Sequence, residues 1–599
     1  MFRFLSGFLC LLSVAAPALC AAEPRQLATE LAPLLKFWEQ SNEAFSLDVR
    51  VQFPDGQRTK SVTLKVARLD DESFDLEAEH EQYAVKIRRR SDRTALLLPT
   101  HRKAYVGEGP VEGEDILRPA GAAQRLVSSG SLIGPYLQLA RGGDARLLTG
   151  LLTQLVGLKY DQQQDCWCGR GVQLRFPAEG DLAVLAGKIQ VDVKVGAPAV
   201  GSDDRWLTDE YRVVKLERAE IERQLARGLR RALEVVAPSP ELTAPRRENR
   251  RVAHGELRWM DGQRVVLLQG TPEEIGRAHG ELLQVEATRC IDSVLYAFGT
   301  VETIRSGEWF RHRLEQAFKR LSRHIPDRHH HETAALADAV GIDRQLAHTL
   351  NVFPELFHCS GFAVFGSATS DGKLYHGRVL DYMTTIGLQD AATTFIVAPR
   401  GQHAFANVGY AGFIGSVTGM NAVGVSLGEM GGRGEGQWDG VPMSTLMRRA
   451  LEECSTLEEV KELWRSSPRT CEYYYVFADG KSNQAVGVAA TPDKLEFIEP
   501  GQADERLGEG IRDAVVLSAG SRLQTLRERV LEKHGAIDAE TARWLMSRPV
   551  AMKSNLHNAL FVPADGVLYV ANADHRRPAA ENPYVRLDLK QLLQELTAQ

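Results

Sequence analysis

The sequence predicts an α+β protein in two parts: a β-rich part, then one in which strands and helices are mixed. Apolar and polar residues alternate in short runs through residues 46–98, a pattern typical of half-buried antiparallel strands. Beyond residue 255, apolar strand-like runs at 265–268, 393–398 and 473–478 are separated by helical patterns. A proline-rich segment divides the two parts.

Residues 1–22 have the pattern of a secretory signal peptide. Arg3 supplies a positive charge, and the apolar run 4–19 ends in small residues. This run is short for a membrane span, and no later stretch is apolar enough for one. We therefore expect a soluble exported protein, periplasmic or secreted, without a transmembrane segment. Cys20 leaves lipid attachment open as an alternative.

Residues 23–236 are predicted to form a β-rich accessory domain. A helix is expected at 30–45, strands from 46 to 98, a helical segment at 126–155, more strands between 172 and 218, and a charged helix at 219–236. This order loosely resembles the half-barrel of bacterial periplasmic lipoprotein-carrier domains. A supporting structural module and a lipid- or peptide-binding module both remain open.

Residues 237–254 are predicted to be a linker. Three prolines, Pro238, Pro240 and Pro245, precede the basic run 246–251. We expect this run to be solvated, because clusters of like charge repel one another. The formal net charge of −6 over 599 residues gives no reason to expect a nucleic-acid partner.

The second part opens with a strand at 265–268 and a capped helix. Thr271 is a plausible N-cap, with Pro272 at the first helical position and Glu274 at the third. Helical pattern continues to residue 350. The histidines 329–331 lack a spaced partner for a metal, so an exposed polar cluster is expected.

Six of the eight cysteines lie beyond residue 22, and export permits disulfides. Cys166 with Cys168 and Cys454 with Cys471 are possible pairs, which spacing alone does not decide. Cys359 is different, because it begins an apolar, strand-like run. Asp371-Gly372 then predicts a hairpin turn, and a second strand ends near Arg378 and Asp381.

If the chain were cut before Cys359, this residue would carry both a thiol and a free α-amine. Their unperturbed pKa values, about 8.5 and 7.7–8.0, suit a nucleophile and a general base near working pH. Arg378 would favour the thiolate and Asp381 would orient the amine. A simple hairpin register does not put both on the face of Cys359, so a bulge or twist is needed. The alternatives are a buried unreactive cysteine and a structural ion pair.

Four blocks of sequence together resemble the autoproteolytic cysteine acyltransferase and hydrolase family. That family includes acyl-CoA:6-aminopenicillanic acid acyltransferase and is related to conjugated bile acid hydrolases and penicillin V acylases. The blocks are Leu268-x-Gly-Thr-x-x-Glu-x-Gly-x-x-His-Gly280, Cys359-Ser-Gly-Phe362, Asp371-Gly with His-Gly-Arg-Val-Leu-Asp381, and Gly419-Met-Asn-Ala-Val-Gly424.

This resemblance implies an N-terminal-nucleophile fold, an αββα sandwich of two antiparallel sheets between helical layers. It implies self-cleavage of the His358–Cys359 bond. Residues 255–358 would then be the α-chain part of the catalytic domain and 359–599 the β chain, and the two chains would stay associated. By the same resemblance Cys359, Arg378 and Asp381 are catalytic, and no metal or dissociable cofactor is required.

The sequence departs from the family where an oxyanion-hole asparagine is expected. Neither residues 425–429 nor residues 516–520 contain an asparagine. Asn421, Glu429 and Asn555 are the candidates for the oxyanion or substrate pocket, and backbone amides are an alternative. Asn421 could instead shape the turn before Gly424.

The predicted function is an exported, self-processing cysteine amidohydrolase that cleaves a linear amide bond of a small N-acyl substrate through an acyl-enzyme. Hydrolysis is favoured over transfer, because acyl-CoA is not expected outside the cytoplasm. One alternative is an acyltransferase with an amine acceptor. The other is a non-catalytic lipid- or peptide-binding protein that only cleaves itself.

Overall fold

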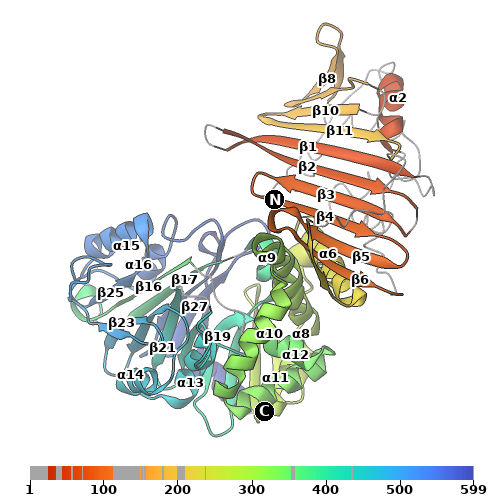
Figure 1. Ribbon diagram of the computed structural model, residues 1–599. Coiled ribbons are helices and arrows are strands. Elements are labelled where there is room, and N and C mark those ends of the chain that lie inside the picture. The colour runs from red at the N-terminus through yellow and green to blue at the C-terminus, as the bar shows by residue number, and fades with distance from the viewer. Residues whose placement is uncertain are drawn as a thin grey trace. The chain divides into compact units, whose positions relative to one another are not determined.

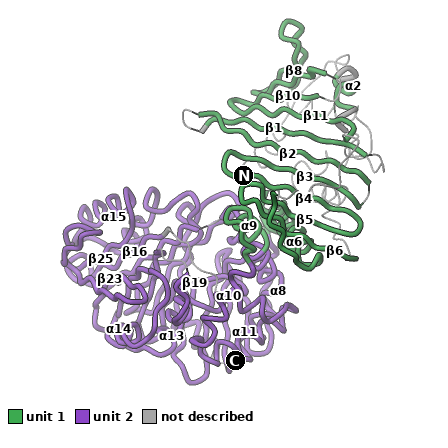
Figure 2. Tube along the Cα trace, viewed as in Figure 1, with its two compact units in different colours: residues 1–244, 296–310 green, residues 245–295, 311–599 purple. Residues whose placement is uncertain are grey.

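The computed structural model describes residues 24–35, 44–55, 58–70, 72–111, 149, 153, 157–178, 181–198, 210–236, 238–351, 358–382, 384–432 and 436–597. These residues form an α+β protein with large sheets, as the sequence predicts (Figure 1). The chain divides into two compact units (Figure 2). The first comprises residues 1–244 and 296–310, and the second comprises residues 245–295 and 311–599.

The first unit is built on a 12-stranded sheet with the order β12-β6-β5-β4-β3-β2-β1-β11-β10-β9-β8-β7. Neighbours from β1 to β6 pair antiparallel in chain order, and β12 pairs parallel with β6. The alternation seen in the sequence therefore predicts β1–β5 correctly, whereas β6 is not among the predicted strands. Their bounds are β1 Phe45–Asp55, β2 Arg58–Arg68, β3 Phe74–His80, β4 Tyr83–Arg89, β5 Arg93–Leu98, β6 Lys103–Glu108, β7 Lys159–Asp161, β8 Cys166–Gly169, β9 Val172–Arg175, β10 Asp181–Ala186, β11 Ile189–Gly196 and β12 Arg212–Lys215.

The helices of this unit are α2 Pro24–Leu35, α6 Arg218–Val236, α7 Pro240–Thr243 and α9 Gly299–Ser306. The helix predicted at 30–45 is wrong in its bounds, because Phe45 already begins β1. The predicted signal peptide lies outside the described residues, as does most of the helical segment 126–155. Ile221 and Leu225 of α6 and Trp309 after α9 pack with the apolar face of β3–β6.

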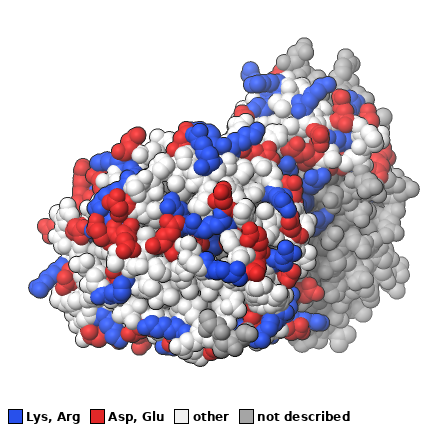
Figure 3. All heavy atoms as spheres, turned by 90° about the horizontal axis from the view of Figure 1, so that it is seen from below, with Lys and Arg blue, Asp and Glu red and all other residues white. Residues whose placement is uncertain are grey.

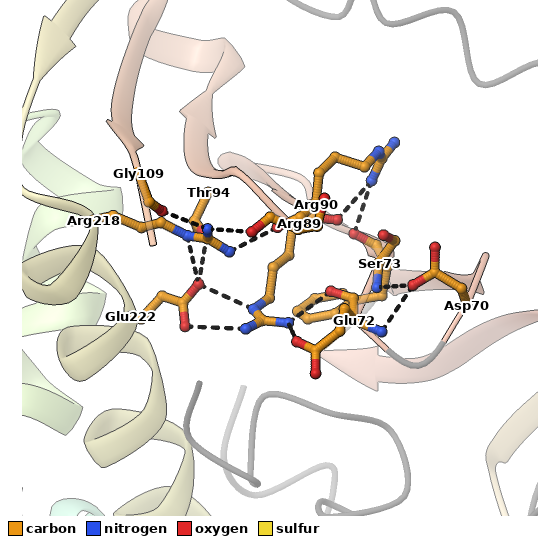
Figure 4. Close-up of polar contacts among 11 residues, drawn as sticks. Asp70, Glu72, Ser73, Arg89, Arg90, Thr94, Gly109, Arg218 and Glu222 are labelled. Atoms are coloured by element: carbon orange, nitrogen blue, oxygen red, sulfur yellow. Dashed lines mark hydrogen bonds and ion pairs between the residues drawn. The ribbon is translucent and has the colours of Figure 1, made fainter. Parts of the chain in front are cut away.

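A buried ionic cluster fastens α6 to the sheet (Figure 4). Glu222 accepts hydrogen bonds from Arg89 Nε at 3.0 Å, Arg218 Nε at 3.1 Å and Thr94 Oγ1 at 2.6 Å. Arg218 also donates to the carbonyl groups of Ser91 and Gly109, both at 2.7 Å. Because the buried side chains of Glu222, Arg89, Arg218 and Thr94 bond to one another or to carbonyl groups, the cluster stabilises the unit.

Two sheets form the second unit. The larger has the order β13-β14-β15-β18-β19-β20-β21-β22-β23-β24, and the smaller β25-β16-β17-β26-β27-β28. Parallel pairing occurs between β15 and β18. The bounds are β13 Arg250–Val252, β14 Gly255–Met260, β15 Gln263–Gly270, β16 His358–Val364, β17 Tyr375–Asp381, β18 Ala392–Pro399, β19 Phe405–Tyr410, β20 Thr418–Asn421, β21 Val425–Gly431, β22 Tyr473–Asp479, β23 Gln484–Ala490, β24 Leu495–Ile498, β25 Ala514–Leu517, β26 Asn555–Val562, β27 Val567–Asn572 and β28 Val585–Asp588.

The two sheets pack against each other through apolar side chains. Leu267 and Met420 of the larger sheet share a buried cluster with Ala559 and Phe561 of the smaller one. Leu526 of α15 and Leu545 of α16 pack on the smaller sheet, while α8 contacts β15 and α14 contacts β22. The helices are α8 Pro272–Ile291, α10 Phe310–Leu321, α11 Asp327–Val340, α12 Arg344–Asn351, α13 Met443–Glu453, α14 Leu457–Ser466, α15 Gly520–Glu532, α16 Ala539–Leu545 and α17 Leu589–Thr597.

The motif at the start of α8 caps this helix and lets it pack closely against α11. Thr271 caps the helix, because its side chain accepts from the Glu274 N–H while the Glu274 carboxylate accepts from the Thr271 N–H at 2.7 Å. Gly276 lies so close to α11 that a Cβ there would overlap the carbonyl oxygen of Glu332. His279 of the same block accepts a hydrogen bond from the Gly412 N–H at 3.0 Å.

The tight hairpin expected at Asp371-Gly372 is wrong in its length. Residues 365–374 connect β16 to β17 and include a short 3₁₀ helix, Gly366–Ala368. Residues far along the chain hold this connection in place. The Asp513 carboxylate accepts a hydrogen bond from the Ser367 N–H at 2.8 Å, and Thr369 forms a β-bridge with Ile537. Of the pair Asp371-Gly372, Gly372 has the positive φ that the turn signal implied, 72°.

The predicted linker 237–254 is partly regular. It contains α7 and β13, and β13 is the edge strand of the larger sheet. Arg250 and Arg251 of the basic run lie in this strand and are exposed. On the face shown in Figure 3, basic and acidic residues are interspersed. Within the described residues, none of the six cysteines forms a disulfide, and no helix is long and apolar enough to cross a membrane.

Candidate active site

Cys359 is the second residue of β16 and lines a cleft of about 340 Å³ in the second unit. The thiol is buried, with 5% of the residue exposed. Most of the cleft wall is apolar; Ser518 and Arg522 line it near the start of α15, and Tyr474 and Arg506 are further polar residues on it. The lining residues are Cys359, Met430, Gly431, Tyr474, Ile498, Arg506, Leu507, Leu517, Ser518, Ala519, Gly520, Arg522 and Leu523.

The pairing of β16 with β17 brings Arg378 to the face of Cys359. Cys359 is opposite Leu380, and Gly361 is opposite Arg378. Directly opposed residues share a face, and so do residues two apart along a strand. Cys359 and Arg378 therefore project to the same side of the smaller sheet.

Arg378 is fully buried and meets a buried acid. Its Nη2 lies 3.5 Å from Glu429 Oε2, and neither side chain is exposed to solvent. Among the described residues, Arg378 Nε and Glu429 Oε1 have no hydrogen-bond partner. Burial raises the pKa of Glu429 to about 7, and the charge of Arg378 opposes this shift. A proton can therefore move on and off Glu429 near neutral pH.

The Cys359 thiol has a raised pKa in the uncut chain. Burial raises this pKa to about 11, Arg378 lowers it through its charge and a hydrogen bond, and the charges of Glu429 and Asp381 raise it. The three groups thus act electrostatically on one sulfur atom. Arg378 is the group among them that favours the thiolate.

Asp381 is held in place by two donors. Its Oδ2 accepts from Arg522 Nη1 at 2.6 Å, and its Oδ1 accepts from the Met552 N–H at 2.8 Å. Burial raises the pKa of Asp381 to about 6, while these donors and Arg378 lower it. The pairing of β17 with β26 shifts register between Leu380 and Asp381. The pairing of β16 with β17 has no such shift and puts Asp381 opposite His358, so the bulge expected between these two strands is not seen in their described residues.

The structure does not put the candidate asparagines on the wall of the cleft. Asn421 donates to the carbonyl groups of Leu451 and Cys454 and accepts from the Val425 N–H, so it shapes the turn into β21. Asn555 donates to the Leu380 carbonyl at 3.1 Å and accepts from the Ala580 N–H at 2.8 Å. Its amide therefore holds the strand end that carries Asp381. Glu429 also lies outside the lining residues.

Three polar residues near Cys359 escaped the sequence reasoning. Ser360 and Ser518 are joined by a hydrogen bond of 2.7 Å between their hydroxyl groups, and Arg522 links Ser360 to Asp381. Arg522 lies in a charged, amphipathic helix, and nothing in its local sequence marks it as a residue of the site. Ser518 lies in the segment 516–520, where the missing asparagine drew attention but the serine did not.

In the residues that the structure describes, no three His, Cys, Asp or Glu side chains cluster so as to hold a metal ion. The histidine run starts α11 and is not a solvated cluster throughout. His329 is buried and pairs with Glu452 at 2.9 Å, whereas His331 is exposed beside Glu273.

One segment of the chain is similar to a known protein family. Residues 367–502 match the model of the acyl-coenzyme A:6-aminopenicillanic acid acyl-transferase family. This match confirms the resemblance drawn from the motifs. Arg378, Asp381, Asn421 and Glu429 fall inside the matched segment, and Cys359 and Asn555 fall outside it.

Individual relatives are more distant. Protein dcd1A of Dictyostelium discoideum is 26% identical over 268 residues, which cover 39% of this chain and 59% of the relative. An N-acylethanolamine-hydrolyzing acid amidase ortholog of Caenorhabditis elegans gives a TM-score of 0.29 at 18% identity, covering 34% of this chain and 93% of the other. A conjugated bile acid hydrolase of Clostridium perfringens gives a TM-score of 0.26 at 13% identity, covering 39% and 93%.

Proposed function

We propose that this protein is a self-processing N-terminal-nucleophile cysteine amidohydrolase that cleaves linear N-acyl amides. The observation that carries the proposal is the surrounding of Cys359. A buried thiol lines an apolar cleft, Arg378 shares its face, and Asp381 is fixed at the adjacent strand end. The match to an acyltransferase family supports the same chemistry.

The first step is cleavage of the His358–Cys359 bond. The Cys359 sulfur attacks the carbonyl carbon of His358, the C–N bond breaks, and an ester to sulfur replaces the amide. Water then hydrolyses this thioester, which frees the thiol and the α-amine. Before the cut the nitrogen is an amide and cannot act as a base, so self-cleavage creates the general base.

In the mature site the α-amine takes the thiol proton, and the sulfur attacks the substrate amide carbon. The tetrahedral intermediate collapses, the C–N bond breaks, and the amine product leaves with that proton. Water then attacks the thioester, gives a proton to the α-amine, and releases the carboxylic acid and the thiol. Asp381, itself held by Arg522 and the Met552 N–H, orients the α-amine.

The cleft favours a substrate with an apolar acyl group. Met430, Ile498, Leu507, Leu517 and Leu523 line it. Burial of an acyl chain against such side chains contributes roughly 0.8 kcal/mol per methylene group. Transfer of the acyl group to an amine acceptor uses the same thioester and is the second candidate. Export to the periplasm or the medium, with hydrolysis as the outcome, belongs to the same proposal.

The two chains would stay together after the cut. Residues 265–270 of β15 pair with residues 394–399 of β18, so strands from both sides of Cys359 share the larger sheet. Val265 and Leu267 lie in the same buried cluster as Phe561 and Leu568. These contacts do not depend on the peptide bond at residue 358.

Mass spectrometry of the purified protein beside Cys359→Ala tests the proposal. A fragment that begins at Cys359 is expected in the wild type and absent in the variant. Cys290→Ala, which removes another buried free cysteine, should be cleaved normally. An uncut wild-type chain would refute self-processing. A cut chain whose Cys359 takes no acyl group from any donor would support a protein that only cleaves itself.

A further inference from the structure

A pair of hydroxyl groups lies beside the nucleophile on the strand pair β16–β25. Gly361 is opposite Leu517 in this antiparallel pair, so the next position puts Ser360 opposite Ser518. The two Oγ atoms are 2.7 Å apart. Ser360 projects from the opposite face of β16 to Cys359 and is fully buried. Ser518 lies just beyond the end of β25, where it and Cys359 both line the cleft.

The direction of this hydrogen bond follows from the other partner of Ser360. Arg522 Nη1 donates to Ser360 Oγ at 3.4 Å and to Asp381 Oδ2 at 2.6 Å. Within the described part of the chain, the acceptor available to the Ser360 hydrogen is Ser518 Oγ. A buried hydroxyl rarely forgoes its donor bond, so Ser360 donates and Ser518 accepts. The Ser518 hydrogen is thus not used in the bond to Ser360, and Ser518 lines the cleft.

The start of α15 adds positive potential at the same place. Ala519 is the N-cap of this 13-residue helix and makes no side-chain capping bond, and Ala519 and Gly520 line the cleft. Uncapped N–H groups at a helix start carry partial positive charge. This is also where the sequence lacks the asparagine that the family resemblance implies.

We propose that the Ser518 hydroxyl is a catalytic hydrogen-bond donor to the substrate carbonyl oxygen. The inference rests on the proposed acyl-enzyme chemistry. When the Cys359 sulfur bonds to the carbonyl carbon, the C=O π electrons move to the oxygen, and Ser518 O–H donates a hydrogen bond to it without transferring its proton. The C=O bond re-forms as the amine leaves, and Ser518 is unchanged. Ser360, held by Arg522, is the positioning residue.

Two reactions of Cys359 separate this role from a structural one. Acylation by 4-nitrophenyl hexanoate passes through a tetrahedral oxyanion, whereas alkylation by iodoacetamide does not. Ser518→Ala should slow acylation about 100-fold, the usual effect of losing one oxyanion donor, and leave alkylation within about twofold. Ser518→Thr, which keeps a hydroxyl, should recover most of the acylation rate.

Ser521→Ala is the matched control, because Ser521 is exposed in the first turn of α15 and keeps its backbone N–H on substitution. It should acylate like the wild type. Equal acylation by wild type and Ser518→Ala would overturn the inference, as would an equal slowing of both reactions. If the wild type is alkylated but never acylated, the proposed acyl-enzyme function itself is refuted. This outcome differs from the two above, which overturn only the role of Ser518.

Discussion

A buried carboxyl group beside a buried guanidinium makes the free energy of unfolding depend on pH. The pKa of Glu429 is about 7 in the folded chain, against an ordinary value of 4.5. The folded state therefore holds this proton more tightly than the unfolded state does. The contribution is fully present below pH 4.5 and is lost as the pH rises through about 7.

Glu429→Gln removes this titration. Urea denaturation from pH 4 to 8 gives the unfolding free energy of each protein. The value for the wild type minus that for the variant should fall as the pH rises through this window. Glu458→Gln is the control, since Glu458 is exposed and Arg465 lowers its pKa. A wild-type-minus-variant difference that stays constant across the window would show that Glu429 keeps an ordinary pKa.

Residue-level chemistry was only partly readable from the sequence. Cys359, Arg378 and Asp381 are predicted because they stand in a recognisable block, and in the structure Arg378 and Asp381 both act electrostatically on the Cys359 thiol. Their catalytic roles stay a prediction. Arg522 was missed because it reaches Asp381 across 141 residues of sequence, a distance that no local pattern encodes. Asn421 and Asn555 were chosen by residue type, but their amides are used by neighbouring backbone groups.

At the scale of elements, two glycines decide how closely α8 and α11 approach. A Cβ at Gly276 would overlap the Glu332 carbonyl group, and one at Gly280 would lie 2.6 Å from Ala339 Cβ. The spacing of four residues puts both on one side of α8. The block that helped to reveal the family is thus a helix-packing surface and not part of the cleft.

Gly276→Ala should lower the free energy of unfolding by about 1–3 kcal/mol, because the extra methyl group forces the helices apart. Chemical denaturation of the uncut Cys359→Ala protein measures this without interference from cleavage. Gly409→Ala in β19 is the control, since its new Cβ would meet Asn407 at an ordinary 3.5 Å. Equal stability of the two variants would argue against close helix packing.

Elements were predicted best where one physical signal dominated. Strands β1–β5 follow a strict alternation, and α8 follows a capping box, so both appear where expected. The β16–β17 connection was predicted too short because its length is set by Asp513 and Ile537, which lie far along the chain. Tertiary contacts of this kind override a local turn signal.

For the whole molecule, the chain crosses between the two units three times, at 244–245, 295–296 and 310–311. The sequence instead assigned everything after residue 255 to the catalytic part. Trp309 belongs to the core of the first unit, where it is 3% exposed and its ring lies 5.0 Å from that of Tyr105. Composition gives no sign of such a return, because an inserted segment is as apolar as its surroundings.

Trp309→Ala should therefore destabilise the first unit by about 3–5 kcal/mol, the usual effect of truncating a buried tryptophan. Differential scanning calorimetry should show one transition moving to lower temperature, while the rate of Cys359 alkylation below that transition stays the same. Trp544→Ala, at a position 38% exposed, should move neither transition much. A concerted shift of all unfolding would mean that the units do not melt separately.

The pairing of β15 with β18 bears on the order in which the protein folds and is cleaved. Before a cut at residue 358, these strands belong to one chain, and their encounter is intramolecular at high effective concentration. Afterwards the same encounter joins two molecules and becomes dependent on protein concentration. Folding would have to precede cleavage, and a mature molecule that unfolds would seldom return. How long the cleaved protein stays folded would then depend on its rate of unfolding and not on a folding equilibrium.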